Sequence, residues 1–93
     1  MLRITLHDSP TVLRFQLEGK LVGPWVAELR RSWQTTWSVQ AGRKLVIDLT
    51  DVAFIDDSGK QLLSELYELG AQFVARQPLT RAIVEQVQHG RTV

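Results

Sequence analysis

The chain has 93 residues, of which 44% are hydrophobic and 23% are charged, and its formal net charge is +1 at pH 7. A chain of this length builds one hydrophobic core, so we expect a single domain over residues 1–93, with the last few residues as a tail. The composition excludes a disordered chain, and the 11 basic and 10 acidic residues form no basic stripe suited to a nucleic-acid backbone.

The sequence also bears on the compartment in which the protein works. No apolar run approaches the length needed to cross a bilayer, and residues 1–7 lack the charged head and long apolar region of a secretory signal. Cysteine is absent, which fits a reducing compartment. We therefore expect a cytoplasmic protein without direct membrane insertion.

Three segments in the first half of the chain predict strands. Apolar and polar side chains alternate over residues 2–6 and again over 13–18, which predicts an antiparallel pair. Residues 44–49 form a nearly continuous apolar run rich in β-branched side chains. Such a run predicts a central parallel strand that is buried on both faces.

A helix is predicted between the second and third of these strands. Pro24 is suited to the first helical position, and the helix runs to about Trp37. Its apolar stripe consists of Val26, Leu29 and Trp33, flanked by Trp25 and Trp37. The stripe predicts packing on the core, although three tryptophans on one helix leave open that part of it is an exposed contact surface.

The second half of the chain predicts two more helices and a short strand. A helix over about 58–69 carries Leu62, Leu63, Leu66 and Leu69 on one side, and Gly70 is placed to end it in a left-handed conformation. Residues 71–75 predict a strand near an edge. Pro78 opens a helix through about 88 with a stripe of Leu79, Ala82, Ile83 and Val87. The order predicts an α/β fold: a mixed four-stranded sheet, mostly parallel with an antiparallel first strand, and three helices mainly on one face.

Residues 48–59, which join the third strand to the second helix, are the most informative stretch. Ser58 followed by Gln61 matches a capping box, which predicts that Ser58 is the N-cap of the helix. The free amides and dipole of a helix start would also stabilise a phosphate carried on Ser58. The residues alone leave both interpretations open.

The same stretch resembles the signature of the STAS domain, the sulfate transporter and anti-sigma factor antagonist domain. The residues that carry the resemblance are Asp48-Leu49-Thr50-x-Val52-x-Phe54-Ile55-Asp56-x-Ser58-Gly59. It extends over residues 2–88 and implies the STAS fold. In bacterial anti-anti-sigma factors of this family, an anti-sigma factor kinase phosphorylates the serine directly before the glycine. By position that serine is Ser58, and the neighbouring acidic residue is Asp56.

The sequence departs from the family pattern at several positions. Val22 stands where the turn after the second strand usually has an acidic residue, Asp57 replaces a Ser or Thr, and Lys60-Gln61 replaces a small apolar pair. After the last predicted helix we expect no fifth strand and no further helix, which members of the family usually have. The fourth strand is therefore expected to be an open edge, and pairing there or through the last helix would give a homodimer.

The leading functional hypothesis is a regulatory protein–protein interaction domain that antagonises an anti-sigma factor and so regulates transcription. Its partner would be an anti-sigma factor or serine-kinase-like protein, with phosphorylation of Ser58 as the switch. The expected contact surface consists of Val22, Asp56, Asp57, Ser58, Gly59, Lys60 and Leu62. An alternative is a non-phosphorylated STAS module that serves as a scaffold or small subunit of a transporter or signalling complex.

An enzyme is not expected. A hydrolase with Ser58 as nucleophile would need a base and an orienting group that the sequence does not display. His7 and His89 are far apart in the sequence, and no His or Cys cluster has metal-ligand spacing, so no metal site and no cofactor are predicted.

Overall fold

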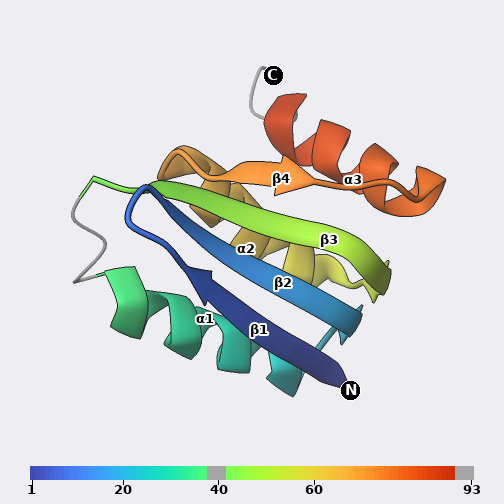
Figure 1. Ribbon diagram of the computed structural model, residues 1–93. Helices are drawn as coiled ribbons and strands as arrows, with labels where there is room; N and C mark the ends of the chain where they lie inside the picture. Colours follow the sequence, from blue (N-terminus) through green and yellow to red (C-terminus); the bar gives the residue numbers. More distant parts are fainter. Residues whose placement is uncertain (38–41, 90–93) are drawn as a thin grey trace.

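The computed structural model describes residues 1–37 and 42–89, with only the backbone of Trp37. Its elements are β1 (Leu2–Asp8), β2 (Val12–Leu21), α1 (Pro24–Trp37), β3 (Lys44–Ile55), α2 (Asp57–Glu68), β4 (Gln72–Val74) and α3 (Pro78–His89). The strands form one sheet in the order β1-β2-β3-β4, in which β1 is antiparallel to β2 and the other pairs are parallel (Figure 1). This is the mixed sheet that the sequence predicts. The predicted tail and most of the loop before β3 lie outside the described residues.

The helices cover one face of the sheet, as predicted. In β2 the side chains of Leu13, Phe15 and Leu17 are buried toward the helices, and those between them point to the opposite, open face. The prediction that the third strand is buried on both faces is confirmed only in part, because Asp48 is buried on the open face but Val46 is not. Leu45, Ile47 and Leu49 are buried, but Val46 is only half-buried, because nothing in the described structure covers the open face at this point.

β3 is longer than predicted, because it extends to Ile55 and takes up most of the expected loop. Two register shifts against β2 each place one extra residue on β3, between Asp48 and Asp51 and between Val52 and Phe54. Each bulge reverses the face to which the following side chains point. Leu49, Val52 and Ile55 are therefore all buried on the core side although they are three residues apart.

The central part of the predicted stripe of α1 is confirmed, and the side chain of Trp37, which was expected to flank it, lies outside the described residues. Val26, Leu29 and Trp33 are buried in the core, and Trp25 packs half-buried against it. On the outer side Arg30 binds Glu65 of α2 through two hydrogen bonds of 2.5 and 3.1 Å. Helices α1 and α2 are thus joined by both apolar packing and a bidentate ion pair.

The predicted stripes of the other two helices need correction at their ends. Leu62, Leu63 and Leu66 of α2 are fully buried, whereas Leu69 lies past the end of the helix and is 43% exposed. Gly70 ends α2 with φ +94°, as predicted, and the amide of Ala71 returns to the Leu66 carbonyl at 3.0 Å.

The buried stripe of α3 consists of Thr80, Ile83, Val84 and Val87. Leu79 and Ala82 are exposed, contrary to prediction, because the helix is rotated by about one residue. The hydroxyl of Thr80 donates to the Gln77 carbonyl at 3.1 Å, which lets this polar side chain be buried in place of the leucine.

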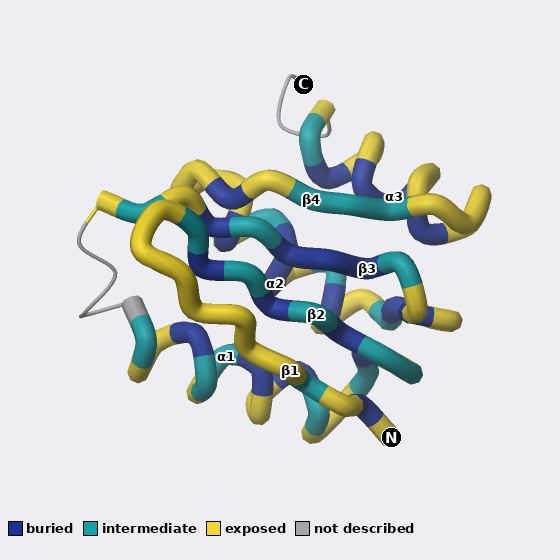
Figure 2. The backbone as a smooth tube through the Cα atoms, in the orientation of Figure 1, coloured by how far each residue is buried: buried dark blue, intermediate teal, exposed yellow. Residues whose placement is uncertain are grey.

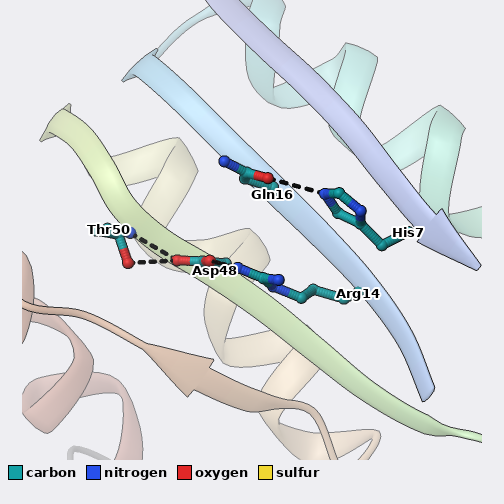
Figure 3. Close-up of polar contacts among 5 residues, drawn as sticks. All are labelled: His7, Arg14, Gln16, Asp48 and Thr50. Atoms are coloured by element: carbon teal, nitrogen blue, oxygen red, sulfur yellow. Dashed lines mark hydrogen bonds and ion pairs between the residues drawn. The ribbon is translucent and has the colours of Figure 1, made fainter.

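A polar network crosses the open face of the sheet (Figure 3). Asp48 is only 4% exposed and forms an ion pair with Arg14 on the neighbouring strand. Its Oδ1 accepts hydrogen bonds from the Thr50 amide at 3.0 Å and the Thr50 hydroxyl at 2.6 Å. Burial by itself raises the pKa of Asp48, but the bonds from Thr50 and Arg14 outweigh it and hold the pKa below its ordinary value.

Replacement of Asp48 by Asn should destabilise the protein by about 1–3 kcal/mol at neutral pH, because Asn keeps the size but loses the charge that Arg14 binds. The folded-state pKa of Asp48 is depressed, so its contribution is present above the unfolded pKa of about 3.9 and is lost as pH falls through the folded value. Urea unfolding between neutral and acidic pH measures this. The free energy of unfolding should fall less on acidification in Asp48→Asn than in wild type, with exposed Asp51→Asn as control. Equal acid dependence of Asp48→Asn and wild type would contradict the assignment.

Candidate functional site

The start of α2 is capped by Asp56. Its Oδ1 accepts a hydrogen bond of 2.8 Å from the Gly59 amide, which is the N-cap bond, and a second bond of 2.8 Å from the Ser58 hydroxyl. The prediction that Ser58 caps the helix with Gln61 was therefore wrong. A carboxylate directly after β3 occupies the cap, the helix begins at Asp57, and Ser58 donates back to the cap from the first turn.

Asp56 also links α2 to the turn that precedes α1. Its Oδ2 accepts a hydrogen bond of 2.9 Å from the Gly23 amide, and its own amide donates to the Leu21 carbonyl at 3.2 Å. These bonds bring the turn that contains Val22 beside the helix start. The hydrogen bonds from Gly59, Gly23 and Ser58 hold the pKa of Asp56 below its ordinary value. The role of Gly23 was missed in the sequence, where Gly23-Pro24 indicates only a turn and a helix start.

The side chains of this segment divide into exposed and buried ones. Asp57 and Ser58 are exposed and Lys60 is half-buried, with Lys60 Nζ 3.9 Å from Asp57 Oδ1. The hydroxyl of Ser58 therefore lies at the surface. Leu62 is fully buried, so its predicted place on the contact surface was wrong: it belongs to the stripe of α2 that packs on the core.

Gly59 is also buried, because the first turn of α2 lies directly on the end of β2. A Cβ at this position would come within 2.7 Å of the Leu21 carbonyl oxygen and 2.8 Å of Ile55 Cγ2. Gly59 thus permits the close approach of α2 to the end of β2, and this approach positions the neighbouring Ser58. The sequence suggested that Gly59 lies on the contact surface, but it is buried beneath that surface.

A shallow apolar groove of about 410 Å³ runs beside Asp57 and Lys60, between the end of β3 and helix α3. Phe54 is 48% exposed and Leu79 is 52% exposed, and both line this groove. Sequence reasoning missed the groove, because the bulge that turns Phe54 outward and the rotation of α3 that exposes Leu79 leave no local pattern.

The chemistry available at Ser58 is that of a surface hydroxyl. The carboxylate beside it already accepts three hydrogen bonds, and its lowered pKa makes it a weak base. Among the residues that the structure describes, no three His, Cys, Asp or Glu side chains gather closely enough to hold a metal ion. In the same ranges, no helix combines the length and the apolar character that crossing a membrane requires.

The sequence profile of the STAS domain matches residues 3–88, so the chain belongs to the STAS domain family. The match includes Ser58 and every residue of the helix start described above. A comparison with curated proteins finds no match.

Solved structures share the fold. An anti-sigma factor antagonist from Mycobacterium paratuberculosis has a TM-score of 0.76 and 26% sequence identity, covering 99% of this chain and 82% of its own. The anti-sigma factor antagonist SpoIIAA in its unphosphorylated form has a TM-score of 0.66 and 19% identity, over 90% and 83% of the two chains. An antisigma-factor antagonist STAS domain from Rhodobacter sphaeroides has a TM-score of 0.59 and 20% identity, over 80% and 84%. At their level of identity the last two establish the fold alone.

Replacement of Gly59 by Ala should destabilise the protein by about 1–3 kcal/mol, because the added methyl group meets the backbone of Leu21. Helix propensity alone predicts the opposite sign, since Ala is favoured over Gly by about 1 kcal/mol in a helix. Urea denaturation distinguishes the two. Exposed Gln61→Ala on the same helix is the control and should change stability by less than about 0.5 kcal/mol. Stability equal to or above wild type in Gly59→Ala would refute the close approach.

Replacement of Asp56 by Ala should destabilise the protein more than replacement of Ser58 by Ala, because Asp56 accepts from three donors and Ser58 contributes one of them. If Ser58 were the cap, the order would be reversed. Thermal unfolding of the two variants at neutral pH shows directly which one is less stable. A larger loss of stability in Ser58→Ala than in Asp56→Ala would show that Ser58 is the N-cap.

Proposed function

We propose that this protein is a regulatory protein–protein interaction domain of the anti-sigma factor antagonist kind, whose binding is switched by phosphorylation of Ser58. One observation carries the proposal: the Ser58 hydroxyl is exposed at a helix start and is oriented by Asp56 at 2.8 Å. It occupies this place in a STAS domain, and the compared anti-sigma factor antagonists share the fold.

A phosphate on Ser58 would change the charge and the hydrogen bonds of this surface together. Ser58 now donates to Asp56, whereas a phosphate, which carries about −1.5 to −2 charges at pH 7, is mostly deprotonated and acts mainly as an acceptor. The group would stand beside the carboxylates of Asp56 and Asp57. The helix start and Lys60 would offset part of the repulsion, so the folded domain would persist while its binding surface became more negative.

The partner surface that we propose combines this polar segment with the neighbouring groove. Asp57, Ser58 and Lys60 supply the polar rim, and Phe54 and Leu79 supply apolar area beside it. Protein interfaces typically have such an arrangement of an apolar centre and a polar rim. Val22 and Asp56, which meet at the Gly23 turn, complete the surface.

Two positions, Val22 and Asp57, favour a second function. Val22, half-buried beside Asp56, stands where related switches usually carry an acid, and Asp57 already provides a permanent negative charge next to Ser58. A site with a fixed charge is suited to constant binding, as in a scaffold or small subunit of a transporter or signalling complex. We place either function in the cytoplasm. A hydrolase is not proposed, because the weakly basic Asp56 is the only side chain bonded to Ser58 in the described structure.

Affinity capture from the native source tests the switch against the scaffold. Wild type and Ser58→Ala should retain a common protein partner, Ser58→Asp should lose it, and Leu69→Lys should retain it as an exposed control outside the surface. Incubation of wild type with the captured partner and ATP, followed by mass spectrometry, should give phosphate on Ser58. Retention of the same partner by Ser58→Asp, with no phosphate on Ser58, would reject the switch and support the scaffold.

A further inference from the structure

The outer edge of β1 is unpaired. The sheet order places β1 at one edge, and the described residues include no strand on its far side. The Lys20 amide donates to the Met1 carbonyl at 3.1 Å, which makes Met1 and Lys20 a hydrogen-bonded pair of the antiparallel ladder. Because such pairs alternate, the backbone groups of Arg3, Thr5 and His7 face β2. Those of Ile4 and Leu6 therefore face outward.

The same edge exposes apolar side chains on the helix-covered side of the sheet. Leu6 is 42% exposed and Ile4 is half-buried, and both line a cavity of about 410 Å³ that lies between β1 and α1. Figure 2 shows β1 exposed along most of its length, in contrast to β2 and β3. Outward-facing backbone groups and uncovered apolar side chains thus occur on the same residues.

β1 has few of the features that block the pairing of another strand, and its charged residues are Arg3, on the open face, and Asp8, at the end of the strand. Its register with β2 is continuous over seven residues without a bulge, and the strand contains neither proline nor lysine. No side chain on the helix-covered side within 2–6 is charged. Soluble proteins commonly protect a sheet edge with a bulge, a proline, a lysine or an inward-pointing charge, or keep the edge strand short. The opposite edge is short: β4 has only three residues.

We propose that β1 pairs with β1 of a second copy of this chain, antiparallel about Thr5, to form a continuous eight-stranded sheet. A second copy fits because the centre of the strand is self-complementary in this register, whereas toward the ends Arg3 would face His7 and Leu2 would face Asp8. Ile4 would face Leu6 of the second copy, which covers the exposed leucine, and Thr5 would face Thr5, a favourable cross-strand pair. Ile4 and Leu6 would form the hydrogen-bonded pairs, in agreement with the direction of their backbone groups. The edge shares no residue with the Ser58 surface.

The association should be concentration-dependent, because a single strand pair buries less than the roughly 1,200 Å² of a stable interface. Sedimentation equilibrium up to about 1 mM protein measures it. Wild type should dimerise, Leu6→Lys should shift the dissociation constant upward by at least about tenfold through an inward-pointing edge charge, and Leu69→Lys, whose leucine is 43% exposed, should behave as wild type. A strict monomer, or equal dimerisation of Leu6→Lys, would overturn the proposal.

Single cysteines test the register, because the chain has no cysteine of its own. In the proposed dimer the two Thr5 Cα atoms lie about 4.5 Å apart, within disulfide range, and the two Arg3 Cα atoms lie about 14 Å apart. Thr5→Cys should therefore form a covalent dimer on mild oxidation and Arg3→Cys should not. Amide exchange should protect Ile4 and Leu6 at high concentration only. Cross-linking of both variants alike, or a dimer in which these amides stay unprotected, would place the contact elsewhere.

Discussion

The carboxylate of Asp56 joins the segments that meet at the start of α2. One oxygen holds the Gly59 amide and the Ser58 hydroxyl, and the other holds the Gly23 amide of the turn before α1. Three donors on one ionised acceptor fix the direction of the helix, the position of the turn and the orientation of the serine together. The orientation of the exposed Ser58 hydroxyl therefore depends on the Asp56 carboxylate, which the Gly59 and Gly23 amides hold in place. A charge added to Ser58 acts directly on the acceptor that organises the surface.

The sheet and the core bring Asp56 to this position. The two bulges of β3 keep Leu49, Val52 and Ile55 on the core side, so the strand stays anchored up to the residue before the cap. Gly59 then lets the helix turn directly onto the end of β2. Ser58 is exposed between the buried residues Ile55 and Gly59, so its hydroxyl is accessible on a packed frame. The groove beside it, with Phe54 and Leu79, arises from the same geometry.

The order and type of the elements, the antiparallel first strand and the side of the helices were predictable, because alternation, helical periodicity and proline or glycine at helix ends are local signals. The family signature also located the exposed serine. Features that depend on tertiary pairing were not predictable. Because of its two bulges, the second half of β3 lacks the alternation of a regular strand, so it was predicted as a loop. Asp56 is the cap because its carboxylate also binds the Gly23 amide, which is distant in the sequence. In α3, Thr80 is buried where Leu79 was expected to be. A local sequence pattern does not show which face of a strand or helix will be covered by a neighbouring element.

We propose above all that the surface held by Asp56 changes its binding when Ser58 changes its charge. The most direct measurement compares the affinity of a purified partner for the protein with serine and with phosphoserine at position 58, both shown to be folded by circular dichroism. We expect phosphoserine to raise the dissociation constant at least about tenfold, which corresponds to about 1.4 kcal/mol. Equal affinity of the two forms for that partner would contradict it.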